Sequence, residues 1–146
     1  MSRNKISQIY ETVKRINRVY EVWAGKHGLT LYEMQIYYVI WEREKHKITQ
    51  KELSKQLDAP KTSINSIIKK QLKTGRIEMS VNPLNKREKI IVLTKEGERF
   101  AKESICPLFQ YEEEAASEFS DNEWEIAMNT QTKFANILWD KMNVKP

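Results

Sequence analysis

The sequence predicts a mainly α-helical fold with one small β-hairpin. Apolar residues recur every three or four positions along most of the chain, which is the spacing of amphipathic helices. Residues 77–93 differ, because two apolar runs there flank a turn-rich stretch, as in a hairpin. A chain of 146 residues with 40% hydrophobic residues is expected to form a single domain around one core.

Two helices are predicted before the central region. The first covers about twenty residues and ends near Gly25 or Gly28. Its apolar stripe consists of Ile6, Ile9, Val13, Ile16, Tyr20 and Trp23. Thr30 and Glu33 have the spacing of a capping box and open the second helix. That helix is apolar over a wide arc, so we expect it to be largely buried.

Residues 48–75 predict two short helices joined by a tight turn. Thr49 and Glu52 form a second capping box. Pro60 suits the first position of the next helix. The apolar stripe of that helix consists of Ile64, Ile67, Ile68 and Leu72. Gly75 then ends it, as a glycine past the last turn commonly does.

The second of these short helices has an outer face suited to reading DNA. Turning about 100° per residue places short polar groups in its first turns and lysines behind them. This face comprises Thr62, Ser66, Lys69 and Lys73, with Asn65 at its edge. A recognition helix needs small polar groups near base edges and cations near phosphates. An ordinary solvated face has the same pattern, so the helix alone does not decide between the two interpretations.

The predicted hairpin favours DNA binding. Residues 77–81 alternate as in a half-buried strand, and residues 90–93 form the return strand. The tip between them, residues 82–89, is rich in turn formers and basic. Thr94 then caps the next helix. Helix, turn, helix, basic hairpin and helix is the element order of a winged helix-turn-helix.

At these residues the chain resembles the MarR (multiple antibiotic resistance regulator) family. Its wing signature is an acidic residue-x-Arg-Asp/Asn-x-Arg, followed later by Leu-Thr-x-x-Gly. The corresponding segments are Asn82-Pro83-Leu84-Asn85-Lys86-Arg87 and Leu93-Thr94-Lys95-Glu96-Gly97. Three residues depart from the family pattern. Asn82 stands where an acid is frequent, Leu84 where an arginine is frequent, and Gln71 where leucine is usual on the apolar face of the recognition helix.

The resemblance implies a winged helix-turn-helix lobe at residues 31–99 within a single domain of residues 1–146. Residues 1–28 and 100–146 would be dimerisation helices that interlock between protomers. The sequence favours a homodimer independently, because one small domain can hardly cover two long apolar helices at opposite ends of the chain. Two recognition helices would then enter successive major grooves about 34–36 Å apart, on a pseudo-palindromic operator.

The residues expected to contact double-stranded DNA are polar or basic and lie on the two short helices and the hairpin tip. They are Gln50, Lys61, Thr62, Asn65, Ser66, Lys69, Lys73, Lys86, Arg87 and Lys89. The charge distribution agrees with this expectation. Residues 43–102 contain 16 basic and 7 acidic residues, a net charge of +9, whereas residues 103–146 have a net charge of −6. Such segregation is typical of a nucleic-acid-binding surface.

Two further helical stretches are predicted after the hairpin. The first runs from Thr94 toward Ala116 and is kinked or divided at Pro107. Ser120 and Glu123 form a third capping box, which opens the last helix.

Several classes of function find no support in the sequence. The two histidines and the one cysteine lie in no nucleophile or metal-binding motif, so we expect no enzyme, metal site or cofactor. No apolar run approaches the ~20 residues that span a bilayer. The N-terminus lacks the apolar stretch of a signal peptide, and a single cysteine agrees with a reducing compartment. The protein is therefore expected to be cytoplasmic and to have no membrane partner.

Two features have two interpretations each. Cys106 is either a redox-sensing thiol, which needs exposure and a lowered pKa, or a small apolar group in a dimerisation helix. A set of aromatic residues with one histidine is either core or the wall of a pocket for a small aromatic or phenolic effector, as family members often have. This set is Trp23, His27, Tyr37, Tyr38 and Trp41.

The sequence thus predicts a MarR-like, homodimeric transcriptional regulator that binds double-stranded DNA sequence-specifically. We expect a repressor that is released by a small ligand. One alternative is a redox-sensing regulator that acts through Cys106. The other is a winged-helix adaptor whose basic face meets an acidic protein partner. Salt-dependent binding to duplex DNA with a preferred sequence separates a regulator from an adaptor.

Overall fold

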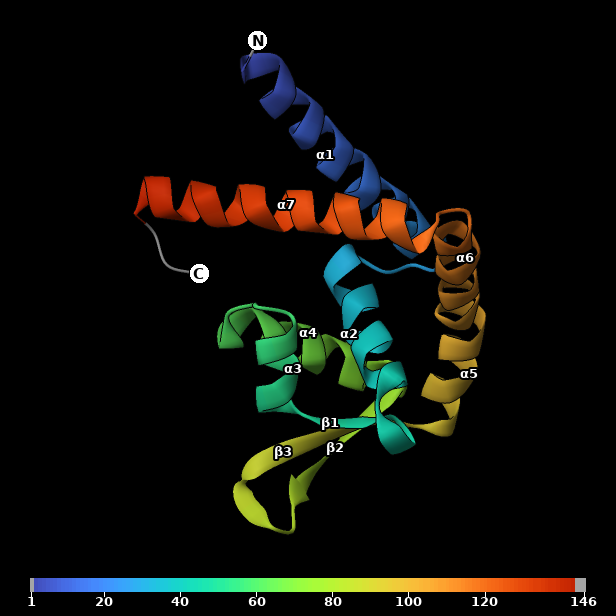
Figure 1. The fold of residues 1–146 in the computed structure, drawn as a ribbon. Coiled ribbons are helices and arrows are strands. Elements are labelled where there is room, and N and C mark those ends of the chain that lie inside the picture. The colour runs from blue at the N-terminus through green and yellow to red at the C-terminus, as the bar shows by residue number, and fades with distance from the viewer. Residues whose placement is uncertain (1, 144–146) are drawn as a thin grey trace. The chain divides into compact units, whose positions relative to one another are not determined.

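The computed structural model describes residues 2–143 and is mostly helical (Figure 1). The helices are α1 Ser2–Lys26, α2 Leu31–Glu42, the short 3-10 helix η1 Glu44–His46, α3 Gln50–Gln56, α4 Lys61–Lys73, α5 Lys95–Ser104, α6 Cys106–Ser117 and α7 Asp121–Met142. The strands are β1 Lys47–Thr49, β2 Ile77–Asn82 and β3 Asn85–Leu93. The mainly α fold with a small hairpin that the sequence predicts is therefore confirmed.

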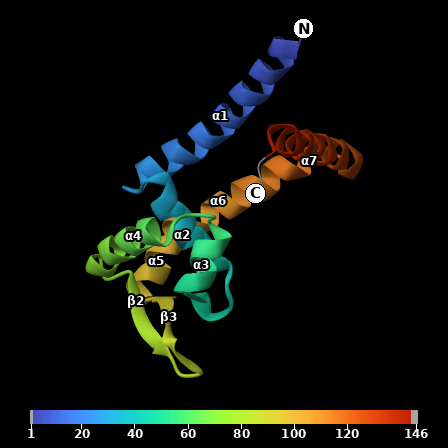
Figure 2. The same ribbon diagram turned by 90° about the vertical axis from the view of Figure 1, so that its left-hand side faces the viewer.

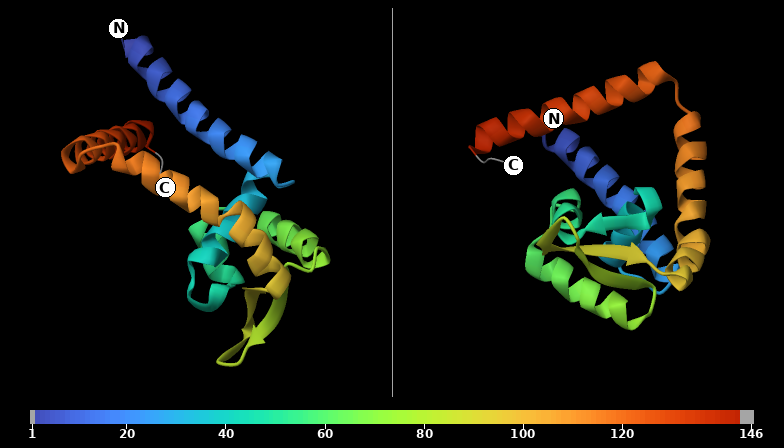
Figure 3. Two further views of the ribbon diagram at one scale, coloured as in Figure 1. Left: turned by 90° about the vertical axis from the view of Figure 1, so that its right-hand side faces the viewer. Right: turned by 90° about the horizontal axis from the view of Figure 1, so that it is seen from below.

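The chain divides into two compact units, with the boundary between Pro107 and Leu108. The first unit contains α1 to α5 and the strands, and α6 crosses the boundary. Within the first unit, α1 extends as a long helix away from the lobe formed by the other elements (Figure 2). The hairpin of β2 and β3 projects from the opposite side of that lobe (Figures 2 and 3).

Helices begin where the sequence supplies a cap. Thr30, Thr49 and Ser120 each accept a hydrogen bond from a backbone N–H three residues later, and the glutamate at that position reaches back to the cap. All three predicted capping boxes are thus present. Thr94 caps α5 in the same way, by accepting from the N–H of Gly97 at 3.0 Å. These caps satisfy donors that a helix cannot satisfy internally.

Two local boundaries differ from the prediction. Pro60 is the cap residue of α4 and not its first helical residue. The predicted tip at residues 82–89 is shorter, because β3 already begins at Asn85. The side chains of Asn82 and Asn85 explain this, since each accepts a backbone N–H two residues later, from Leu84 at 3.0 Å and from Arg87 at 3.2 Å. Such Asx turns allow a tight connection.

A third strand, β1, was not predicted. It pairs antiparallel with β3, so the sheet order is β1-β3-β2. In this pairing Ile48 lies opposite Ile91, and both side chains are buried. Three residues are too few to show the alternation by which a strand is recognised in a sequence. Pro107, near the start of α6, divides the helical stretch after the hairpin, as expected.

The core of the first unit is centred on α2. Ile36, Tyr37 and Ile40 are completely buried on this helix, as its wide apolar arc predicts. The inner faces of α3 and α4 contribute Leu53 and Ile64, which are also completely buried. This packing fixes the two short helices on one side of α2, so their other faces are left to solvent.

The N-terminus of α5 is packed tightly against the turn after α4. The Thr94 hydroxyl donates to the carbonyl of Gly75 at 2.6 Å, and the Thr94 N–H donates to the carbonyl of Arg76 at 3.0 Å. Gly97 lies so close to this turn that an added Cβ would be 1.8 Å from the Arg76 carbonyl oxygen. The glycine of the Leu-Thr-x-x-Gly segment is therefore required by a close approach of two backbones.

Replacing Gly97 by alanine should lower the free energy of unfolding by about 3 kcal/mol or more, because the methyl group collides with backbone atoms. Urea unfolding followed by circular dichroism measures this loss. Gly25→Ala is the matched control, since a Cβ at Gly25 meets nothing within 4 Å and α1 should gain roughly 0.5–1 kcal/mol. Equal stability of the two variants would contradict the close approach.

Candidate nucleic-acid interface

Helix α4 presents two different faces. Ile64, Ile68 and Gln71 are buried against the lobe. The residues expected to face DNA from this helix are exposed or half-buried: Lys61, Thr62, Asn65, Ser66, Lys69 and Lys73. The angular separation predicted from the sequence is therefore present, with short polar groups near the start of the helix and lysines toward its end.

A groove of about 540 Å³ lies where α3, α4 and the hairpin converge. Its walls comprise Gln50, Lys51 and Ser54 of α3, Lys61 and Asn65 of α4, and Arg87, Glu88 and Lys89 of β3. Five of the ten residues expected to contact DNA line this groove. The structure places the other five elsewhere: Thr62, Ser66, Lys69 and Lys73 lie along α4, and Lys86 lies at the start of β3.

Three of the residues that line the groove are not among the DNA contacts predicted from the sequence. Lys51 and Ser54 lie on α3, which the family resemblance does not single out, and Glu88 lies between two basic residues. A helical wheel of α3 would have found Ser54, which follows Gln50 by one turn, and Lys51, which lies one turn before Ser54. The position of β3 beside α3 could not be found in this way.

The electrostatics of the groove favour an anion. Four of its eight lining residues are Lys or Arg and one is acidic. The carboxylate of Glu88 accepts a hydrogen bond from the Asn82 side chain at 3.0 Å. Helix α4 begins without a side-chain cap at Pro60, so the N–H groups of its first turn add partial positive charge. These features suit a phosphate backbone.

Two polar side chains in the groove are placed for recognition. Gln50 Nε2 donates a hydrogen bond to Asn65 Oδ1, which links the start of α3 to α4. This bond holds the Asn65 amide and leaves its NH₂ group as a donor. Within the described part of the chain, the buried hydroxyl oxygen of Ser54 has no hydrogen-bond partner. The Asn65 NH₂ group is therefore the donor that this pair offers to a bound polar molecule.

The five residues that the sequence suggests for an effector pocket make several separate local contacts. The Trp23 indole N–H donates to the Ser104 carbonyl at 2.7 Å, and its ring packs on His27 with 4.8 Å between centroids. Trp41 stacks on His46 at 4.1 Å. Tyr38 is half-buried.

Tyr37, the fifth residue of that set, is completely buried. Its hydroxyl donates to Gln71 Oε1 at 2.6 Å. Burial raises the pKa of the Tyr37 hydroxyl above its ordinary value, so the neutral hydroxyl is the donor.

Cys106 lies near the start of α6 and is half-buried. Burial raises the pKa of its thiol, and the nearby Lys102 opposes this only in part. A raised pKa leaves less thiolate at neutral pH, whereas a sensing thiol requires more. The local environment therefore favours the interpretation of Cys106 as a small apolar group.

Residues 2–143 contain no candidate for a metal site or a membrane-spanning helix. Among these residues, no group of three or more His, Cys, Asp or Glu side chains is arranged to hold a metal ion. In the same range, no helix combines the length and apolar character required to cross a membrane.

Known proteins that are similar to this chain include transcriptional regulators. No family model matches the chain. The chain is 27% identical over 125 residues to the uncharacterized HTH-type transcriptional regulator YwoH of Bacillus subtilis, covering 86% of this chain and 89% of YwoH.

Two solved structures share the fold at low sequence identity. AbsC, a MarR family transcriptional regulator from Streptomyces coelicolor, superposes with a TM-score of 0.75 at 14% identity, over 92% of this chain and 93% of AbsC. S. aureus MepR in complex with DNA superposes with a TM-score of 0.72 at 16% identity, over 89% of this chain and 96% of MepR. The chain therefore has the winged-helix fold of the MarR-family transcriptional regulators.

Proposed function

We propose that this protein is a cytoplasmic, sequence-specific regulator of transcription that binds double-stranded DNA as a homodimer. The observation that carries this proposal is the basic groove in which α3, α4 and the hairpin meet. A helix face with short polar groups lies beside a charged wing, so base edges and phosphates can be contacted together. MepR, which has the same fold, was solved in complex with DNA.

The DNA-binding lobe is proposed to be residues 31–99, with residues 1–28 and 100–146 forming the dimer. Helix α1 supports this division. Its apolar stripe continues beyond the lobe, and Ile9, Val13 and Ile16 are 39%, 50% and 52% exposed in the single chain. Helix α7 likewise exposes large apolar side chains, with Trp124 at 47% and Ile137 at 47%. A second copy would cover such surfaces.

The proposed mechanism is repression released by a small aromatic ligand. Trp23, His27 and Trp41 are half-buried aromatic groups with polar tips, which suits recognition of such a ligand. A ligand would release DNA only by binding the DNA-free arrangement more tightly. The raised pKa of Cys106 does not favour the redox alternative. An adaptor is separated from a regulator by the DNA-binding experiment below.

Two substitutions separate base reading from phosphate contact. Asn65→Ala should cost roughly 1–3 kcal/mol on the operator and much less on scrambled duplex, because Asn65 reaches base edges. Arg87→Ala should weaken binding to both duplexes and lower the slope of log affinity against log salt by about one per protomer, because Arg87 contacts phosphate. Salt titrations of fluorescence anisotropy measure both effects.

Arg18→Ala is the matched control for loss of one positive charge, since Arg18 is an exposed residue of α1. It should leave the affinities and the salt slope unchanged. Wild-type protein that binds operator and scrambled duplex equally would instead support the adaptor. If Arg87→Ala leaves the affinity and the salt slope unchanged on both duplexes, the wing is not part of the DNA interface.

The dimer is tested by a charge on the exposed stripe of α1. Ile16→Glu should shift the sedimentation coefficient toward that of a single chain and reduce operator affinity, because a buried carboxylate at a dimer interface is costly. Lys14→Glu is the control, because Lys14 lies off the stripe and 60% of its side chain is exposed. A dimer that persists equally in both variants at micromolar concentration would show that α1 does not form the interface.

A further inference from the structure

We propose that Tyr37 and Gln71 are positioning residues for DNA recognition: their buried hydrogen bond fixes the rotation of α4 about its own axis and so decides which side chains of α4 face the bases. This inference rests on the proposed function. It concerns a pair of residues on the far side of α4 from the DNA, which would act through Asn65 and Ser66 and not by contact.

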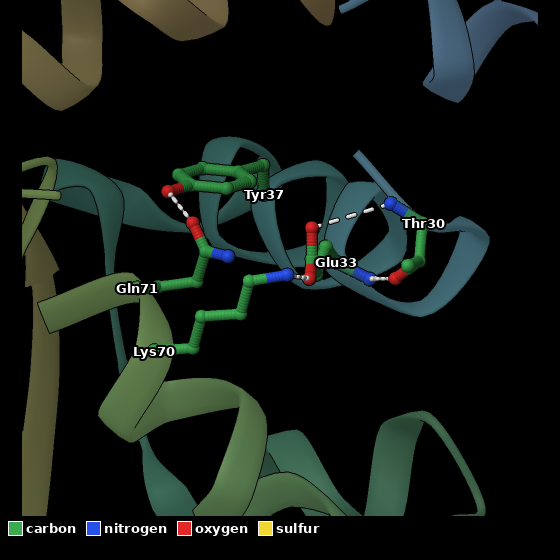
Figure 4. Close-up of polar contacts among 5 residues, drawn as sticks. All are labelled: Thr30, Glu33, Tyr37, Lys70 and Gln71. Atoms are coloured by element: carbon green, nitrogen blue, oxygen red, sulfur yellow. Dashed lines mark hydrogen bonds and ion pairs between the residues drawn. The ribbon is translucent and has the colours of Figure 1, made fainter. Parts of the chain in front are cut away.

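Gln71 occupies a buried position on the inner face of α4. It is 2% exposed and follows Ile64 and Ile68 on that face. Its Oε1 accepts the hydroxyl of Tyr37, which lies on α2 and is completely buried, at 2.6 Å (Figure 4). A leucine would fill this position with apolar contacts alone. The chain instead buries two polar groups that hydrogen-bond to each other.

Apolar and polar contacts constrain a helix differently. Contacts such as those of Ile64 and Ile68 are non-directional, so an apolar face tolerates small rotations and shifts. A hydrogen bond weakens steeply when its distance or angle changes. In a buried site, a broken bond also leaves both partners unsatisfied. The Tyr37–Gln71 bond therefore penalises rotations of α4 that the isoleucines would allow.

The ring of Tyr37 makes a further contact, with α5. It packs edge-on against Phe100 of α5, with 5.2 Å between centroids. The guanidinium of Arg76 lies over the ring of Phe100, 3.6 Å from its centroid. Arg76 immediately precedes β2, the first strand of the hairpin. Tyr37, which anchors α4, thus lies in one packed cluster with α5 and with the residue that precedes the wing.

A second polar contact between α2 and α4 lies beside the Tyr37–Gln71 hydrogen bond. Lys70 Nζ is 2.5 Å from Glu33 Oε1, and Glu33 is only 3% exposed (Figure 4). The other carboxylate oxygen of Glu33 accepts the backbone N–H of Thr30 at 3.2 Å. Consecutive residues of α4 are therefore paired with Glu33 and Tyr37, which are one turn apart on α2. Rotating α4 by one residue, about 100°, would break both the hydrogen bond and the ion pair.

The consequence for DNA reading follows from helix geometry. Gln71 and Ser66 are separated by about 140° around α4, so fixing the inner residue fixes the outer one. Asn65 is held in addition by Gln50. Phosphate contacts from the wing do not depend on this rotation in the same way. Loss of the Tyr37–Gln71 bond should therefore reduce sequence discrimination while non-specific binding remains.

The test is the double variant Tyr37→Phe/Gln71→Leu, measured on operator and on scrambled duplex. It removes both groups of this hydrogen bond together, so neither is left buried without the other, and the fold is expected to persist. The ratio of operator to scrambled affinity should fall by about tenfold, within the range that one mismatched base pair causes. Affinity for the scrambled duplex should fall much less than affinity for the operator, because the phosphate contacts of the wing are kept.

The single variants and a control sharpen this test. Tyr37→Phe deletes one oxygen atom and should lower the ratio as much as the double variant does, because both remove the same bond. Tyr32→Phe is the matched control on α2; Tyr32 is 50% exposed, and this variant should keep the wild-type ratio. Thermal unfolding by circular dichroism establishes that each variant is folded at the assay temperature.

The outcomes are distinguishable. A wild-type protein without preference for any duplex would overturn the proposed function itself. A wild-type protein that discriminates, beside a folded double variant or Tyr37→Phe variant that discriminates equally well, would overturn the positioning role alone. Equal losses on operator and scrambled duplex would also overturn it, because they would mean that the bond only supports the fold.

Discussion

Helix α4 is seated on α2 by a buried face that combines Ile64 and Ile68 with Gln71. This packing determines which side chains α4 presents outward, because a helix exposes the residues that its buried face does not include. The apolar side chains hold α4 against the core, and the Tyr37 hydroxyl at 2.6 Å gives the contact a direction. The groove beside Asn65 exists in its present form only while this orientation is kept.

The hairpin depends on a second constraint, the close approach of α5 to the turn after α4. Thr94 joins the two by donating to the Gly75 carbonyl and accepting from the Gly97 N–H. The lack of a side chain at Gly97 allows the Arg76 carbonyl to lie where a Cβ would otherwise be. Arg76 then packs on Phe100, next to Tyr37. The base of the wing and the anchor of α4 are therefore parts of one packed cluster, and the basic strand β3 projects from it.

Much of this fold was predictable from the sequence, because its signals are local. The capping boxes at Thr30, Thr49 and Ser120 act over three residues and mark the starts of α2, α3 and α7. The contacts that orient the site are not local. Tyr37 and Gln71 are 34 residues apart, so Gln71 was only a departure from an apolar pattern, and Tyr37 was considered for a ligand pocket. Five of the ten expected DNA contacts line the groove, whereas Glu88 joins it only because tertiary packing places β3 beside α3.

The outer face of α4 and the wing together form the proposed DNA-binding surface. Amide chemical-shift mapping of the isotope-labelled protein with an operator duplex tests it directly. The largest shifts are expected at residues 61–66 and 86–89, with small shifts through the acidic segment 112–125. Shifts concentrated in residues 108–142, with residues 61–66 and 86–89 unchanged, would contradict the account.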